Sequence, residues 1–69
     1  MKNFYKLYDK QANELKEKIY NCFLDAEKDR QKWYFDNKEQ GDSTDYATFK
    51  NDIVVCQYDE DFNFIKEIY

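Results

Sequence analysis

The fold of this chain is decided by residues 53–69, which read IVVCQY, then DED, then FNFIKEIY. The first run is β-branched and apolar, the second is a short acidic break, and the third alternates between apolar and polar residues. Two β-prone runs around a short polar turn predict an antiparallel β-hairpin. We therefore expect the chain to end in two paired strands.

One loop separates this hairpin from the rest of the chain. There is no proline, and the only glycine, Gly41, lies in the polar stretch EQGDSTD at residues 39–45. Glycine with clustered Asp, Ser and Thr marks a loop. Residues 46–50 follow it, and their composition fits either a third short strand or a turn of helix capped by Ser43.

The first part of the chain has two interpretations, and the first is a long helix. Apolar residues recur at spacings of three and four from Phe4 to Trp33, with one gap at Arg30. This spacing is typical of a helical stripe. A single helix over residues 3–38 would be roughly 50 Å long, which suits a coiled coil better than a small monomer.

The second interpretation comes from an internal echo fifty residues apart. The pattern YDxxxNxLKE at residues 8–17 matches YDxxxNxIKE at residues 58–67. A strand over residues 4–8, a turn at residues 9–13 and a return strand over residues 15–23 would then precede one helix, capped by Asp25 and ending near Lys38. The favoured prediction is an α+β single domain (residues 1–69), in which a small antiparallel sheet packs with one main helix as ββαββ. A long helix followed by a C-terminal hairpin is the alternative.

The composition indicates a folded cytoplasmic protein. Sixty-nine residues bury only about 60% of their unfolded surface, but six Phe, seven Tyr and one Trp can enlarge a small core. No secretion signal or membrane span is evident. Cys22 and Cys56 are expected to be free thiols. A lysine-to-arginine ratio of ten to one suggests AT-rich coding and a bacterial or phage origin.

Residue types that support catalysis are scarce in this sequence. There is no histidine, no CxxC pair and no glycine-rich loop, so the usual general base, zinc site and phosphate cradle are missing. Asp59, Asp61 and Asn63 have the opening spacing of a calcium loop, but Phe64 stands where that loop needs glycine. We expect no enzyme activity, no cofactor, no metal site and no small-molecule substrate.

Charge and aromatic residues point to a protein partner. Residues 1–40 have nine Lys or Arg against eight acids, whereas residues 41–69 have two lysines against seven acids. Such an acidic half attracts a basic protein surface and makes nucleic acid an unlikely ligand. Strand aromatics on an open sheet face, and the WYF run at residues 33–35, would add apolar contacts. The candidate contact residues are Asp42, Asp45, Asp52, Asp59, Glu60, Asp61, Tyr34, Phe35, Tyr58 and Tyr69.

Two functional hypotheses follow. The first is a small acidic protein-binding module, for example a phage-type inhibitor that docks onto the basic, nucleic-acid-binding surface of a host protein. The second is a structural homo-oligomer, a homodimer for instance, joined through the helical apolar seam.

Overall fold

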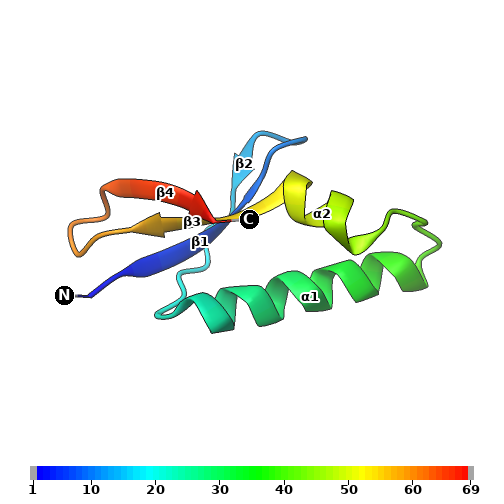
Figure 1. The fold of residues 1–69 in the computed structure, drawn as a ribbon, viewed down its shortest axis with the longest axis horizontal. Helices are drawn as coiled ribbons and strands as arrows, with labels where there is room; N and C mark the ends of the chain where they lie inside the picture. The colour runs from blue at the N-terminus through cyan, green and yellow to red at the C-terminus, as the bar shows by residue number, and fades with distance from the viewer. Residues whose placement is uncertain (1, 69) are drawn as a thin grey trace.

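The computed structural model describes residues 2–68 and has an α+β fold. The elements in chain order are β1 (Phe4–Asp9), β2 (Glu14–Leu15), α1 (Phe23–Glu39), α2 (Tyr46–Asp52), β3 (Ile53–Tyr58) and β4 (Phe64–Ile68). The four strands form one antiparallel sheet, and α1 packs along it (Figure 1). The favoured ββαββ order is confirmed, with the short α2 added between α1 and β3. The long-helix alternative is wrong, because residues 4–9 are a strand.

The strand order is β2-β1-β3-β4. The strands β1 and β3 form the centre and pair along their whole length, from Phe4 opposite Tyr58 to Asp9 opposite Ile53. Each of the two hairpins contributes one central strand and one edge strand, and the register between β3 and β4 shifts near Tyr58. The sheet therefore has a long edge at β4 and a two-residue edge at β2.

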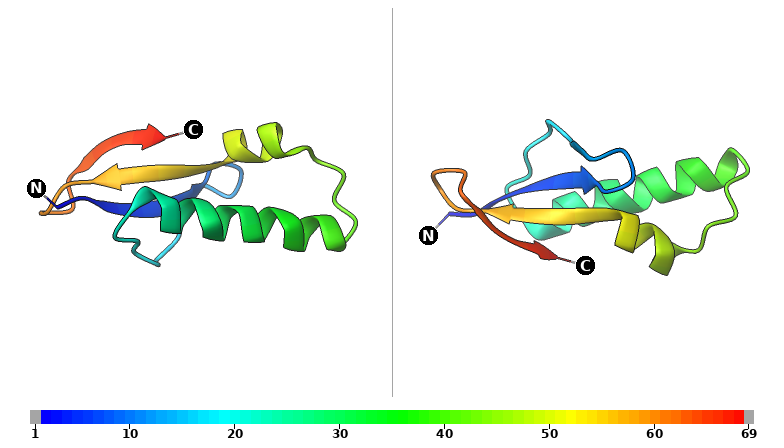
Figure 2. Two further views of the ribbon diagram at one scale, coloured as in Figure 1. Left: turned by 60° about the horizontal axis from the view of Figure 1, so that its bottom comes forward. Right: turned by 90° about the horizontal axis from the view of Figure 1, so that it is seen from above.

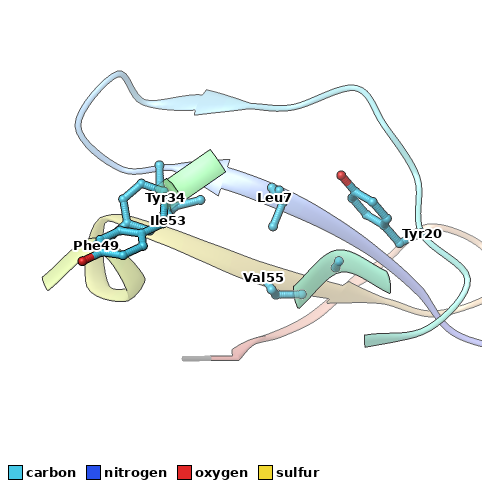
Figure 3. Packing of buried hydrophobic residues seen from close by; sticks show 7 residues of the cluster. Leu7, Tyr20, Tyr34, Phe49, Ile53 and Val55 are labelled. Carbon is cyan, nitrogen blue, oxygen red and sulfur yellow. The ribbon is translucent and has the colours of Figure 1, made fainter. Parts of the chain in front are cut away.

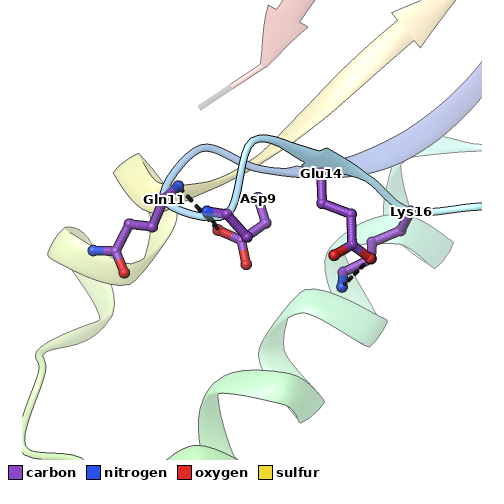
Figure 4. A network of polar contacts seen from close by, with 5 residues as sticks. Asp9, Gln11, Glu14 and Lys16 are labelled. Atoms are coloured by element: carbon purple, nitrogen blue, oxygen red, sulfur yellow. Dashed lines mark hydrogen bonds and ion pairs between the residues drawn. The ribbon is translucent and has the colours of Figure 1, made fainter.

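The internal echo has a physical basis in the two hairpin turns. The Asp9 Oδ1 atom accepts hydrogen bonds from the backbone N–H groups of Gln11 (3.0 Å) and Ala12 (3.1 Å) (Figure 4). The Asp59 Oδ1 atom likewise accepts from the backbone N–H groups of Asp61 and Asn63, both at 2.9 Å. An Asp that binds its own backbone in this way stabilises a turn. Both copies of the echo are hairpins, as the second interpretation predicts.

The return strand of the first hairpin is much shorter than predicted. Strand β2 is Glu14–Leu15, so only Leu15 of the predicted strand 15–23 lies in it. An isolated bridge joins Tyr20 to Tyr5 through backbone bonds of 2.8 and 2.9 Å. The residues between them include the charged run KEK at 16–18, whose side chains are better solvated off the sheet. The edge strand is therefore interrupted where the sequence becomes charged.

Both helices begin with a different cap from the predicted one. The helix α1 starts at Phe23 after Cys22, and Asp25 lies inside its first turn, where a carboxylate favours the helix dipole. Residues 46–50 are helical, and Asp45 caps α2 by accepting from the backbone N–H of Thr48 at 2.8 Å. The cap of α2 is therefore Asp45 and not the predicted Ser43. Asp45 directly precedes the first turn, so its carboxylate reaches the backbone N–H of Thr48, whereas Ser43 lies two residues further away in the chain.

The hydrophobic core lies between α1, α2 and one face of the sheet (Figure 2). Its buried side chains come from every layer (Figure 3): Leu7, Tyr20, Ala26, Tyr34, Phe49, Ile53 and Val55. The aromatic rings of Tyr34, Tyr46 and Phe49 pack edge to face or stacked at 5.0–6.4 Å. The aromatic content of the sequence thus fills a core that short aliphatic side chains could not fill.

The gap in the helical stripe, Arg30, is a fully buried position of α1. Arg30 is fully buried between Ala26 and Tyr34, which lie four residues before and after it on the same helical face. Its Nη1 atom donates to the carbonyl oxygen of Ile53 at 3.1 Å, and its Nη2 atom donates to the carboxylate of Glu27. The guanidinium therefore belongs to the core and joins α1 to β3.

Candidate protein-binding surface

The structure separates the predicted contact residues into two groups. The molecule is elongated, with principal extents of 40, 20 and 19 Å. Tyr58 and the acids Asp59, Glu60 and Asp61 lie at or beside the β3–β4 turn, at the same end as the N-terminus (Figure 1). The acids Asp42, Asp45 and Asp52 lie around α2 at the other end, together with Tyr34 and Phe35. The acidic half of the sequence is therefore not one continuous acidic surface.

The run WYF at residues 33–35 is placed differently from its expected arrangement. We expected this run to add apolar contacts, with Tyr34 and Phe35 among the contact residues, but Tyr34 is buried, Trp33 is half-buried and Phe35 is 59% exposed. The reason is that the face of α1 directed at the sheet runs through Ala26, Arg30 and Tyr34. Tyr34 is therefore a core residue, while Phe35 remains available for contact. Tyr69 lies outside the described residues.

The face of the sheet opposite α1 forms a shallow apolar groove. Side chains alternate along a strand, so Leu7 and Val55 face the core while Tyr8 and Cys56 face the other side. The groove has a volume of about 280 Å³. Its lining comes from all four strands: Tyr8, Leu15, Cys56, Tyr58, Phe64 and Glu67. No helix covers this face in residues 2–68, so we call it the open face (Figure 2).

Large apolar side chains are exposed on the open face and at its margin. Phe64 is 57% exposed and Leu15 is 40% exposed. The ring of Phe64 meets that of Tyr58 edge to face at 5.9 Å, and Phe62 stacks on Phe4 at 4.8 Å. The ring contacts limit the conformational freedom of the Phe64 and Phe62 side chains.

The acidic turn at residues 59–61 borders this aromatic group. The Asp59 carboxylate accepts backbone N–H bonds in the turn, chiefly from Asn63, and these bonds lower its pKa. Glu60 accepts the backbone N–H of Lys2 at 2.9 Å, and both Glu60 and Asp61 are exposed. At neutral pH the turn therefore presents negative charge beside exposed rings. Of the predicted contact residues, this end of the molecule brings together Tyr58, Asp59, Glu60 and Asp61.

Several residues of the open face were not among the predicted contacts. They are Tyr8, Leu15 and Phe64, together with Phe62 at the turn. Strand alternation placed Tyr8 and Leu7 on opposite faces, but it did not say which face the helix covers. Leu15 pairs with Tyr8 in the first hairpin, whose return strand the echo predicts, but the echo did not define which side chains of that hairpin face the groove.

The described residues also limit other kinds of site. Residues 2–68 contain no group of three or more His, Cys, Asp or Glu placed to hold a metal ion. None of the helices described is long and apolar enough to cross a membrane. Cys22 is exposed, and burial raises the pKa of the Cys56 thiol.

Comparison with known proteins adds no relative. No protein-family model matches the chain, and no curated protein or solved structure gives a significant match.

Proposed function

We propose that this protein is a small protein-binding module that contacts its partner through the open face and the adjoining acidic turn. The observation that supports this most strongly is the exposure of Phe64 and Leu15 on the face that α1 leaves uncovered. Exposed apolar patches bounded by polar residues are typical of interaction sites. Tyr, Phe and Trp side chains are also frequent in the centre of interfaces.

The chemistry of this surface indicates which side chains the proposed partner would carry. A protein that fits it has apolar side chains to enter the groove and Lys or Arg side chains to meet Glu60 and Asp61. Surfaces that bind nucleic acid are rich in such cations. The protein would therefore act as an inhibitor of the phage type, in the cytoplasm of a bacterial host, by occupying a basic surface without catalysing a reaction.

The experiment is site-specific photo-crosslinking in bacterial extract. A photoreactive phenylalanine analogue replaces Phe64 in one sample and the exposed Leu24 of α1 in another. The result expected is one crosslinked protein at position 64 and none at position 24. Leu24 is 67% exposed, so it is a matched control for exposure alone.

Two substitutions test the chemistry of the contact. Phe64→Thr keeps a residue that suits a strand and removes the ring, and it should weaken capture at least about tenfold. Glu60→Gln with Asp61→Asn should slow association and reduce its dependence on salt, because exposed charges act over about 8–10 Å in ordinary buffers. Equal crosslinking at positions 64 and 24, or capture that Phe64→Thr leaves unchanged, would refute the proposal.

A further inference from the structure

A second apolar hollow lies at the other end of the molecule, between α1 and α2. It has a volume of about 290 Å³ and is lined by Gln31, Tyr34, Phe35 and Tyr46. Phe35 is 59% exposed at its rim, and its ring meets Tyr34 edge to face at 5.5 Å. The hollow is distinct from the open face, because its lining comes only from the helices.

Two lysines lie beside this hollow, and a third lies on the same face of α1. The Nζ atom of Lys38 lies 5.5 Å from the ring centre of Tyr34, and that of Lys50 lies 5.6 Å from the ring centre of Tyr46. Lys28 is exposed on the same helical face as Gln31, three residues away. The nearby carboxylate of Glu27 already accepts from Arg30 and from the Tyr46 hydroxyl (2.6 Å). The carboxylate of Asp45, which precedes Tyr46, already accepts the backbone N–H of Thr48 at 2.8 Å. The hollow is thus an apolar site with two lysines at its margin and nearby carboxylates that are hydrogen-bonded within the protein.

The β3–β4 turn has the complementary chemistry. Its residues read Asp59, Glu60, Asp61 and Phe62, and the Phe62 ring is 47% exposed. The backbone of Phe62 is in the left-handed region, with φ of 62°, which directs the chain sharply at the tip of the hairpin. One face of the ring is stacked on Phe4, and the rest is open to contact. We call residues 59–62 the acidic tip.

We propose that the acidic tip of one copy of this protein binds the lysine-rimmed hollow of a second copy. Phe62 contacts Phe35 and Tyr46 of the neighbour, and Glu60 and Asp61 approach Lys38 and Lys50. The occupant is a second copy because the chain itself contains both halves of a complementary contact, with an aromatic ring flanked by carboxylates and an apolar hollow flanked by ammonium groups.

The position of the two surfaces allows two kinds of assembly. The tip and the hollow lie towards opposite ends of a molecule 40 Å long (Figure 1). A tip–hollow contact made once between each pair of copies joins them head to tail. Two antiparallel copies that make the contact twice form a closed two-fold dimer, because the tip of each then lies in the hollow of the other. This contact shares Glu60 and Asp61 with the proposed partner surface, but it does not rest on the proposed function, and Phe64, which lies outside it, distinguishes the two.

The test is sedimentation of single-end variants and of their mixture. Phe62→Asn removes the ring and keeps a residue that tolerates a left-handed backbone, while Phe35→Ser alters only the hollow. The wild type should associate as its concentration rises, as a two-fold dimer or as longer head-to-tail species, and each variant alone should associate at least about tenfold more weakly. An equimolar mixture of the two retains one intact tip and one intact hollow. It should form dimers near 17.2 kDa, twice 8.6 kDa, and nothing larger.

Charge reversal gives a second, independent measurement. The pair Lys38→Glu and Lys50→Glu should abolish association, as should the pair Glu60→Lys and Asp61→Lys, and mixing the two proteins should restore it. Leu24→Ser, about two helical turns before Gln31 and outside the lining of the hollow, should associate like the wild type. Phe64→Thr should also associate normally, which separates this contact from partner binding.

Three results would overturn the inference. They are a wild type that stays monomeric up to about 1 mM, single-end variants that each associate as strongly as the wild type, or a mixture of the single-end variants that stays monomeric while circular dichroism shows both to be folded. The last result would mean that association needs some other surface.

Discussion

Replacing Arg30 with methionine tests whether the buried guanidinium holds α1 to the sheet. Methionine has a similar length and no charge, so the change removes both hydrogen bonds of Arg30 and leaves most of the volume filled. Arg30 is fully buried, and its Nε atom has no hydrogen-bond partner among residues 2–68. The substitution would leave the carboxylate of Glu27 without its cation and the carbonyl of Ile53 without its donor.

The expected loss is large for a domain of this size. Breaking a buried ion pair by removing one partner costs about 3–5 kcal/mol, and an unsatisfied buried carbonyl is part of that cost, at about 1–3 kcal/mol. The total free energy of unfolding of 69 residues is about 3.5–10 kcal/mol. Arg30→Met should therefore leave the protein barely folded, whereas Lys32→Met, at an exposed position of the same helix, should stay within about 0.5 kcal/mol of the wild type.

The double variant distinguishes the charge from the packing. Adding Glu27→Gln to Arg30→Met removes the isolated carboxylate, so the double variant should be more stable than Arg30→Met alone. The measurement is urea unfolding at pH 7, followed by the fluorescence of Trp33. A single variant within about 1 kcal/mol of the wild type, or a double variant less stable than the single one, would refute this account of the core.

The same pair predicts a dependence on acid. Burial raises the pKa of Glu27, but the hydrogen bonds from Tyr46 and Arg30 outweigh burial and lower it below its usual value. The contribution of Glu27 to stability is therefore complete above about pH 4.3, the pKa in the unfolded chain, and is lost as the pH falls through the lower folded value. The double variant should lack this loss.

Three further predictions concern the cap, the phenols and the thiols. Asp45→Ala should lower the free energy of unfolding by about 1 kcal/mol, whereas Ser43→Ala should change it by less than about 0.5 kcal/mol; equal losses in urea unfolding would contradict the observed cap. Burial, with a neighbouring carboxylate, raises the pKa of Tyr20, so its contribution is complete below about pH 10 and is lost as the pH rises further. Unfolding measured between about pH 9 and 11 should show a smaller fall for Tyr20→Phe. Cys22 should react with a thiol reagent at once and Cys56, buried at the base of the open-face groove, much more slowly until the protein unfolds; equal rates for both thiols would contradict the burial of Cys56.

The order of the two hairpins and the helix along the chain could be predicted from the sequence, because each hairpin depends on local chemistry. Asp9 and Asp59 bind the backbone of their own turns, so the repeat of YDxxxN contains enough information to define two hairpins. The position of β1 beside β3 could not be predicted in this way. That pairing joins residues about fifty apart and depends on packing against α1 rather than on any local pattern.

The candidate site could be predicted only in part, for a similar reason. The acids and Tyr58 at the β3–β4 turn are adjacent in sequence, so their grouping follows from the hairpin. The separation of Asp42 and Asp45 from them follows from the direction of α2, which the sequence did not define. The burial of Tyr34 could not be predicted, because the buried face of α1 runs through Ala26, Arg30 and Tyr34. A search for apolar periodicity treats the charged Arg30 as a gap and so misses this face.

The long free edge at β4 has a consequence for how these molecules meet in concentrated solution. A two-fold axis that joins two β4 strands side by side runs perpendicular to the sheet and keeps both helices on one side. The register that pairs all five residues of β4 is centred on Lys66, so it sets the two ammonium groups against each other and places Ile65 opposite Glu67. Charged side chains in the middle of an edge strand discourage uncontrolled sheet growth. This register of β4 with a second copy of β4 is therefore unfavourable, whereas a strand of different sequence would not bring the two lysines together.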